Sequence, residues 1–229
     1  MISVVIPTLN AEATLADTLT ALIPAVVAGI VREVVIVDGG STDRTQKIAD
    51  ASGAHLIQSS PGRGRQLCAG ADQCRGDWLL FLHADTVLDA GWEREAAQYM
   101  ERVALGKRPP AAAAFRFALD DLGFMPRLVE VGVGVRCALL KLPYGDQGLL
   151  LERALYREIG GFQAMPLMED VEIIRRLGRK RVAILRSRAI TSAARYRRDG
   201  YIGRIARNLT CLTLYIARAP LSLIVRLYG

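Results

Sequence analysis

Two aspartates, each of which follows an apolar run, are the first candidates for catalytic or ligand-binding residues in this chain. Asp38 follows Val-Val-Ile-Val, and Asp85 closes the segment Leu-Leu-Phe-Leu-His-Ala-Asp. A third apolar run, residues 2–6, leads to Thr8 and Asn10. Short β-branched runs predict buried parallel strands, and ligands of open α/β sheets bind beyond the carboxyl ends of the strands. We therefore expect these four polar side chains to line one crevice, where two acids would serve a polar ligand or a metal ion.

A strand-end aspartate can also act as a helix cap. Its carboxylate then accepts hydrogen bonds from the first N–H groups of the next helix. Asp38 precedes Gly39-Gly40-Ser41-Thr42, a segment that suits such a cap. Capping and ligand binding therefore both stay open for Asp38.

The elements that must position these residues alternate regularly in the first half of the chain. Repeated β-α-β units imply a parallel sheet with right-handed crossovers. Strands are predicted at 2–6, 33–37, 54–58 and 78–82, and helices at 12–28, from Ser41 or Thr42 onward, at 66–74 and at 89–105.

The regular alternation of predicted strands and helices ends after Pro109-Pro110. We interpret the break at 106–110 as a boundary between two halves of one domain, because no linker or internal repeat is visible. The second half predicts strands at 111–119, 149–151 and 182–186, helices at 124–140 and from Glu169-Asp170, and a helical turn at 153–159.

Composition limits the classes of partner. The chain has 229 residues, 51% of them hydrophobic, and a net charge of +7, which suits phosphate-bearing ligands or an anionic membrane surface. Nucleic acid fits less well, since only 6% of residues are aromatic. The four cysteines form no C-x-x-C pair, so a structural zinc site is not expected. The first residues lead straight into a strand without a basic segment, so we expect no signal peptide and a cytoplasmic protein.

The tail from Tyr201 to Tyr228 is apolar with interspersed arginines. Its longest charge-free stretch, 208–217, is half of the ~20 residues needed to span a bilayer, so we exclude a membrane span. Two interpretations remain open: a helix at the inner face of the cell membrane, or a helix packed on the domain or on a second subunit.

Taken together, these segments resemble the family 2 glycosyltransferases, which have the GT-A fold, a mostly parallel Rossmann-like sheet flanked by helices. The sequence around His83, Gly145 and Glu169 is most similar to a bacterial subgroup named radical-SAM/selenodomain-associated transferase 2. The resemblance implies a GT-A domain at 1–197, with a nucleotide-binding half at 1–105 and an acceptor-binding half at 111–197, and an amphipathic helical tail at 198–229. It rests on Val5–Asn10, Val35–Asp43, Leu80–Asp85, Gly160-Gly161-Phe162 and Glu169-Asp170, in that order.

The resemblance implies a nucleotide site at the first two strand ends. In the family, the loop matching Pro7 to Asn10 and the acid matching Asp38 hold the nucleoside of a sugar nucleotide. The segment Gly62-Arg63-Gly64-Arg65 matches a loop near the diphosphate, where Arg65 would supply a fixed cation; a solvated loop charge is the alternative. It is not a dinucleotide loop, because Leu67 stands where a third glycine would fall. The expected nucleotide-binding residues are Pro7, Thr8, Asn10, Asp38, Arg65 and Asp85.

The resemblance also implies a divalent cation at His83-Ala84-Asp85. This segment stands where the family has an Asp-x-Asp motif, so the first acid is replaced. Asp85 matches the last acid, which ligates a cation bridging the two phosphates. Mn²⁺ or Mg²⁺ prefers oxygen ligands, and a nitrogen from His83 would favour Mn²⁺. A half-buried His83 turned toward the sheet is the alternative.

Glu169-Asp170 matches the acidic pair in which the aspartate is the catalytic base. An inverting transfer needs a carboxylate to deprotonate the acceptor hydroxyl; an acid favoured by the helix dipole is the alternative. Arg195 stands where processive relatives carry Gln-x-x-Arg-Trp, but the glutamine and tryptophan are missing, so a single transfer is favoured. The expected donor-sugar and acceptor region comprises Asp146, Gln147, Glu169 and Arg195.

The expected protein is an inverting, metal-dependent glycosyltransferase that uses a nucleotide-diphosphate sugar, UDP-linked by preference, with a lipid or membrane-proximal acceptor. Two other functions remain open. A nucleotidyltransferase of related fold would want a glycine-rich basic loop after the first strand, where this chain has Pro7–Asn10. An inactive sugar-nucleotide sensor would have no use for a base such as Asp170.

Overall fold

A single eight-stranded mixed sheet organises the residues that the structure, a computed structural model, describes, 1–228. The strand order is β3-β2-β1-β4-β7-β6-β8-β5. The pairs β3–β2, β2–β1, β1–β4 and β6–β8 are parallel, and the other three are antiparallel. The expected α/β class with the GT-A type of sheet is confirmed. The strands are β1 (Ile2–Thr8), β2 (Val31–Asp38), β3 (His55–Gln58), β4 (Trp78–Phe81), β5 (Thr86–Leu88), β6 (Ala112–Asp120), β7 (Leu149–Glu152) and β8 (Val182–Ser192).

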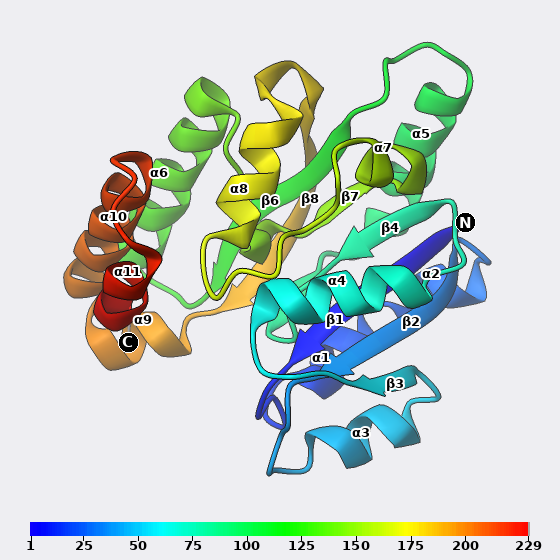
Figure 1. Ribbon diagram of the computed structural model, residues 1–229. Helices are drawn as coiled ribbons and strands as arrows, with labels where there is room; N and C mark the ends of the chain where they lie inside the picture. Colours follow the sequence, from blue (N-terminus) through cyan, green and yellow to red (C-terminus); the bar gives the residue numbers. More distant parts are fainter. Residues whose placement is uncertain (229) are drawn as a thin grey trace.

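Helices cover both faces of this sheet (Figure 1). One face packs against α1 (Leu15–Thr20), α2 (Ile23–Val27), α3 (Thr45–Ala51) and α5 (Trp92–Ala104). The other packs against α4 (Arg63–Gln73), α7 (Arg153–Glu158) and α8 (Glu169–Leu177). Two short 3₁₀ turns are η1 (Gly145–Gln147) and η2 (Arg179–Arg181). A further group lies beyond β6 and consists of α6 (Phe124–Leu140), α9 (Ala194–Asp199), α10 (Tyr201–Ile216) and α11 (Leu221–Tyr228).

Alternating side chains of β1 tie the two layers to one sheet. Ile2, Val4 and Ile6 enter the core under α1, α2 and α5, whereas Val5 enters the core under α4. All four are fully buried, as expected for a strand covered on both sides. The carboxyl end of β1 is therefore fixed between helices.

The helix expected at 12–28 is wrong as one element. The structure has two short helices, α1 and α2, separated at Ala21 and Leu22. Pro24 occupies the first turn of α2, where its missing N–H costs nothing, but it could not have continued a helix from α1.

The helix expected from Ser41 or Thr42 is also wrong, because α3 begins at Thr45. The backbone N–H of Ser41 is bound to Asp38, and that of Thr42 to Asn10, so both residues form a loop. Asp43 then accepts the N–H of Thr45 at 2.9 Å and opens the helix.

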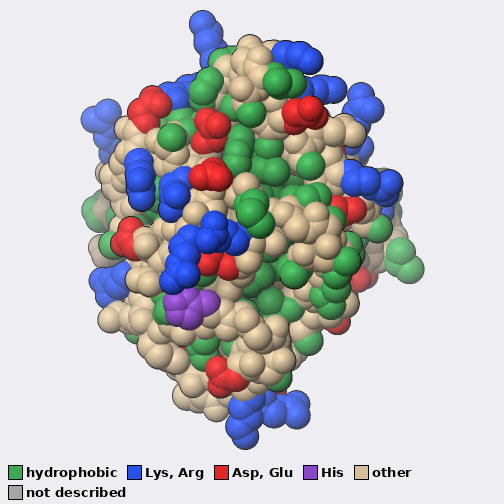
Figure 2. All heavy atoms as spheres, turned by 90° about the vertical axis from the view of Figure 1, so that its right-hand side faces the viewer, with side chains coloured by type: hydrophobic (Ala, Val, Ile, Leu, Met, Phe, Trp, Pro, Cys, Tyr) green, Lys and Arg blue, Asp and Glu red, His purple; other side chains and the backbone are tan. Residues whose placement is uncertain are grey.

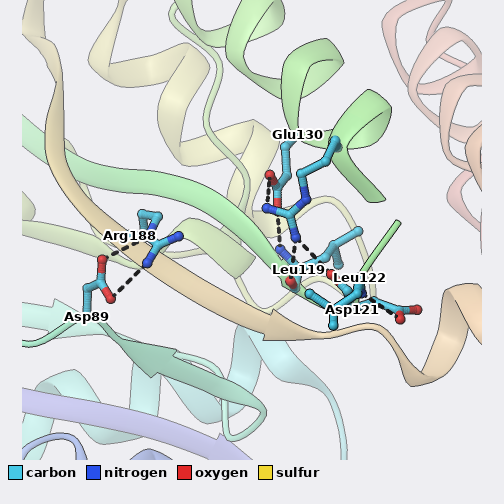
Figure 3. Close-up of polar contacts among 7 residues, drawn as sticks. Asp89, Leu119, Asp121, Leu122, Glu130 and Arg188 are labelled. Carbon is cyan, nitrogen blue, oxygen red and sulfur yellow. Dashed lines mark hydrogen bonds and ion pairs between the residues drawn. The ribbon is translucent and has the colours of Figure 1, made fainter. Parts of the chain in front are cut away.

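Two strands differ from expectation where the second half meets the first. The strand expected at 182–186 continues to Ser192, and β5 was not expected at all. β8 gains its length by pairing with β6 on one side and with β5 on the other. An ion pair between Asp89 and Arg188 closes the β5 end of this pairing (Figure 3).

The helix expected at 124–140 is confirmed as α6. Its first turns are tied to the end of β6, because Glu130 accepts the N–H of Leu119 at 2.9 Å and pairs with Arg127 (Figure 3). Arg127 also donates to the carbonyl of Asp121. The expected tail consists of α9, α10 and α11, and its last residue, Gly229, lies outside the described residues.

No helix within residues 1–228 combines the length and apolar character that a bilayer crossing requires. Figure 2 shows the face that holds the amino end of β1, where acidic and basic side chains are interspersed with apolar ones. The polar residues of the candidate site lie at the other ends of the parallel strands, their carboxyl ends.

A close approach at Gly64 gives the first prediction. A Cβ at this position would lie 2.8 Å from the carbonyl oxygen of Met165 and still closer to that of Gln163. Gly64→Ala should therefore lower the free energy of unfolding by about 1–3 kcal/mol, measured by denaturant titration. Gly132→Ala is the matched control, because nothing lies within 4 Å of its added Cβ, and it should keep or raise stability. Equal stability of both variants would contradict the close packing.

Candidate active site

A crevice with two adjoining compartments lies at the carboxyl ends of β1 and β4. The larger, about 470 Å³, extends along Pro7, Thr8 and Asn10. The smaller, about 110 Å³, reaches between η1 and the start of α8. The wall that both compartments share consists of Arg63, His83, Asp85, Leu167, Arg195 and Tyr228.

Asp38 lies behind this crevice and does not line it. Its buried carboxylate accepts hydrogen bonds from the hydroxyls of Thr8 and Ser41, from the N–H groups of Gly40 and Ser41, and from Gln46. Burial opposes its charge, but these hydrogen bonds hold the pKa of Asp38 below its usual value. Asp38 therefore closes the loop before α3 and does not cap the helix, which begins at Thr45, and these bonds occupy every acceptor position of its carboxylate.

Asn10 and Gln66 hold the rim of the larger compartment. Asn10 has a left-handed backbone (φ 51°) and accepts the N–H of Thr42 at 2.9 Å, which joins the loops behind β1 and β2. Gln66 is buried and donates at 2.8 Å to the carbonyls of both Thr8 and Val37. Sequence reasoning missed Gln66; the available signal was a polar residue on the side of α4 that faces the sheet.

The segment with His83 and Asp85 is fixed from two directions. Thr18 donates to the carbonyl of Ala84 at 3.0 Å, and the N–H of Ser192 donates to the carbonyl of Asp85 at 3.0 Å. The pKa of His83 lies well below its usual value because of burial and the positive charges of two arginines. His83 is therefore a neutral imidazole at neutral pH, and a neutral ring nitrogen can accept a hydrogen bond or bind a metal ion.

Arg63, and not Arg65, faces the crevice. Its guanidinium forms an ion pair with Glu169 and lies 4.0 Å from Asp170. Burial works against its charge, but these carboxylates hold the pKa of Arg63 above its usual value. Arg65 is exposed on α4 and lines neither compartment. The two arginines differ because α4 begins at Arg63, so residues two apart point to different sides.

Asp170 lines the smaller compartment next to η1. Its carboxylate accepts the N–H of Gly145 at 2.8 Å and is 15% exposed, toward the smaller compartment. A Cβ on Gly145 would come within 2.7 Å of His83 Nε2 and 3.4 Å of Asp170. A glycine is thus required at position 145, where both side chains approach the backbone. Glu169 itself is fully buried against Arg63.

Asp146 is the least satisfied acid of the site. Its Oδ1 is buried without a hydrogen-bond partner in the described part of the chain. Burial, together with the charges of Asp170 and Asp85, raises its pKa to about 6 despite the nearby Arg136. A carboxylate oxygen held in this way has free capacity for a cation or a substrate hydroxyl.

The acids fit a divalent cation only in part. Among residues 1–228, no three His, Cys, Asp or Glu side chains lie close enough together to hold a metal ion. Asp85 and the unpartnered Asp146 line the same compartment, so a cation there would take its other ligands from a bound diphosphate and water.

Gln147 has a structural position, unlike its neighbour Asp146. It is buried, donates to the carbonyl of Phe115 at 2.8 Å, and accepts from Arg136 and the N–H of Tyr144 at 3.3 Å. These bonds hold η1 against β6, and Gln147 lines neither compartment.

The C-terminal helices complete the wall of the site, which the sequence did not reveal. Arg195 lines both compartments and donates to the hydroxyl of Tyr228 at 3.4 Å. The guanidinium of Arg204 lies 4.5 Å from the centre of the Tyr228 ring, and Cys211 lines the smaller compartment. Of the expected residues, the structure thus brings together Pro7, Thr8, Asn10, His83, Asp85, Asp146, Asp170 and Arg195, with Glu169 behind them, and leaves Asp38, Arg65 and Gln147 outside.

Comparison with known proteins finds one matching family model and several similar relatives. The model of glycosyl transferase family 2 matches residues 3–117, half of the chain. Glucosyl-3-phosphoglycerate synthase of Mycobacterium tuberculosis (strain H37Rv) is 36% identical over 95 residues, which cover 38% of this chain and 29% of that protein. The PGL/p-HBAD biosynthesis glycosyltransferase of Mycobacterium bovis (strain BCG Pasteur) is 37% identical over 101 residues, covering 38% and 36%. The matches thus span about a third of each relative's length.

Solved structures extend the similarity over nearly the whole fold. A crystal structure of the Mycobacterium tuberculosis glucosyl-3-phosphoglycerate synthase with Mn²⁺, UDP and glucosyl-3-phosphoglycerate has a TM-score of 0.65 at 23% identity, covering 96% of this chain and 81% of that chain. The structure of the same protein with Mg²⁺ and UDP has a TM-score of 0.64 at 23% identity, covering 96% and 80%. The fold is therefore shared well beyond residue 117.

The raised pKa of Asp146 gives the second prediction. The native carboxyl keeps its proton up to about pH 6, whereas the unfolded chain releases it near pH 4. Stability should therefore fall as the pH rises between these values. Asp146→Asn has no carboxyl to titrate and so does not lose this stability. Its free energy of unfolding, relative to that of the wild type, should therefore rise by on the order of 2 kcal/mol from pH 4 to pH 7. Thermal unfolding in a chelating buffer measures it, and a pH-independent difference would contradict the raised pKa.

Proposed function

The chain belongs to glycosyl transferase family 2, and from this membership we propose that it transfers a sugar from a UDP-sugar to an acceptor hydroxyl with inversion. The observation that carries the proposal is the pair of adjoining compartments, one along the loop behind β1 and one that Asp170 faces. The UDP bound in the related synthase structures supports the choice of nucleotide. Within the family, we propose that the chain belongs to the radical-SAM/selenodomain-associated transferase 2 subgroup, on the motifs at Leu82–Thr86 and Gly145–Gly148.

The larger compartment would hold the nucleotide. Pro7, Thr8 and Asn10 form its floor, and Arg63 and Arg195 stand where it meets the smaller compartment. Two guanidinium groups at this junction suit a diphosphate, since a guanidinium can donate two hydrogen bonds to phosphate oxygens. We therefore propose residues 1–105 as the nucleotide-binding half, 111–197 as the acceptor-binding half, and 198–229 as a tail that closes the site.

A cation at Asp85 would complete the diphosphate site. Mn²⁺ or Mg²⁺, when bound, would neutralise the charge that collects on the departing diphosphate. One neighbour on the same compartment wall, His83 or Asp146, is its second candidate ligand, and the diphosphate and water would supply the others. The Mn²⁺ and Mg²⁺ in the related synthase structures support this assignment.

Asp170 would act as the general base. It takes the proton of the acceptor hydroxyl while that oxygen forms its bond to the anomeric carbon and the bond from this carbon to the diphosphate breaks. The N–H of Gly145 fixes one carboxylate oxygen, and the ion pair of Arg63 with Glu169 keeps the second acid of the motif away from the reacting centre.

The acceptor would be a lipid or another molecule held at a membrane. The support for this choice is the surface of the C-terminal helices, which form one wall of the smaller compartment through Arg204, Cys211 and Tyr228. An inactive sensor would have no use for a base such as Asp170 in the smaller compartment. A nucleotidyltransferase would need a glycine-rich basic loop after β1, and this chain does not have one there.

The third prediction concerns the metal dependence of UDP binding. Because UDP carries about three negative charges and the site also contains acids, UDP should bind with Mn²⁺ and hardly at all with a chelator. Asp85→Asn should abolish the metal-dependent part, and His83→Ala should weaken it modestly. Titration calorimetry measures both. Asp72→Asn, an exposed acid on α4, is the control and should bind like the wild type. Equal affinity with and without metal would refute the assignment.

The fourth prediction separates an enzyme from a sensor. Asp170→Asn keeps the shape of the side chain but removes its basic electron pair, so donor affinity should stay unchanged while turnover falls by ~10²–10⁴-fold. Donor hydrolysis by water serves as the assay, because water needs the same proton acceptor.

The matched control for this experiment is Glu172→Gln. Glu172 lies on the same helix, but it pairs with Arg176 and lines neither compartment, so turnover should hold. If Asp170→Asn lost turnover only through weaker donor binding, Asp170 would belong to the nucleotide site. An unchanged rate would remove it from the mechanism.

A further inference from the structure

The outer side of α6 carries an uncovered apolar stripe. Phe124, Leu128, Val131, Val135 and Leu139 follow one another at spacings of three and four residues, and each is at least 48% exposed. That spacing places them on one side of a helix. An uninterrupted apolar row of this kind on a surface helix signals a binding surface, whereas scattered apolar residues do not.

A second stripe lies on α10, which contacts α6 (Figure 1). Ile202, Leu209 and Ile216 repeat at intervals of seven residues and are at least 57% exposed. The opposite sides of these helices are the packed ones, with Val129 of α6 buried against β6 and Cys211 of α10 buried against α8. We call the two stripes together the α6–α10 face.

The charge around this face has one sign. Residues 122–141 and 201–228 contain seven arginines and lysines but a single acid, Glu130. Glu130 is only 17% exposed, and its carboxylate is engaged at the end of β6, where it accepts the N–H of Leu119 and pairs with Arg127 (Figure 3). Arg204 and Arg207 pair with Asp199 of α9 and Arg127 pairs with Glu130, so the cations of these two segments without an acidic partner are Arg136, Lys141, Arg218 and Arg226.

A groove of about 360 Å³ continues the face between the ends of α6, α8 and α10. Within the described residues, its lining includes no acid. Leu142, Leu212 and Ile216 supply apolar surface, while Lys141, Arg175 and Arg179 supply three cations. This is the composition that suits an anionic headgroup joined to an apolar chain.

We propose that the α6–α10 face binds the surface of an anionic lipid bilayer, with its stripes at the headgroup–acyl boundary and headgroup phosphates in the groove. A second copy of the chain is the poorer occupant, because two such faces would bring like charges together without acids to pair them. Interfacial binding of this kind combines buried apolar area with attraction to anionic lipid. It stands independently of the transferase chemistry.

Vesicle flotation of the full chain tests the proposal. Binding is expected to vesicles of equal phosphatidylglycerol and phosphatidylcholine, to weaken in high salt, and to be far weaker on phosphatidylcholine alone. Val131→Glu/Leu139→Glu should reduce binding at least about tenfold, since it removes two inserted side chains and adds two negative charges. Arg175→Gln/Arg179→Gln should reduce it about fivefold per charge.

Two control variants make the same changes elsewhere. Val27→Glu/Leu105→Glu replaces equally exposed apolar residues, and Arg32→Gln/Lys107→Gln removes exposed cations; both should bind like the wild type, with melting temperatures of all variants compared. Failure of the wild type to float, or equal losses in control and test variants, would overturn the proposal. So would a dimer in sedimentation equilibrium that Val131→Glu/Leu139→Glu dissociates without any vesicle binding, which would assign the face to a second copy.

Discussion

The ion pair between Arg63 and the buried Glu169 is the interaction on which the candidate site depends. A carboxylate without solvent exposure costs several kcal/mol unless it is paired and hydrogen-bonded. Glu169 has Arg63 as the partner of its Oε1, while its Oε2 is buried without a partner in the described residues. This requirement draws the first turn of α4 toward the first turn of α8. Because Asp170 follows Glu169 directly, the same contact sets the position of the base relative to the nucleotide half.

The polar residues around the crevice divide into two groups by how fully they are hydrogen-bonded. Asp38 and Gln147 form their hydrogen bonds with other groups of the protein, and Asn10 joins two loops. They make the strand ends and η1 rigid. Asp85 and Asp146 retain capacity toward the compartment. A rigid outer set allows the inner acids to stay close together, although burial, and after it the charges of Asp170 and Asp85, raises the pKa of Asp146.

The sequence predicted the strand ends well, because alternation and apolar runs reflect burial in a sheet. It therefore predicted the crevice and the place of Asp85, whereas Asp170, at the start of α8, was expected there from the family resemblance. It could not choose between Arg63 and Arg65, because that choice depends on where α4 begins, and the first helical turn has no local cap. The role of Asp38 was equally undecided, since the same loop sequence suits a cap and a ligand. Tyr228 was beyond reach, because only the packing of α10 and α11 brings residue 228 to Arg195.

The C-terminal helices join the two surfaces of greatest interest. The inner side of α10 places Arg204 and Cys211 at the smaller compartment, while its outer side presents Leu209 to the surroundings. A helix with one side in the active site and the other at a membrane cannot shift on one side without moving the other, because its core is close-packed. Contact with a bilayer would then hold the wall of the acceptor compartment in place. For an acceptor that itself resides in the membrane, this arrangement would bring the reactive hydroxyl and the base Asp170 to the same boundary.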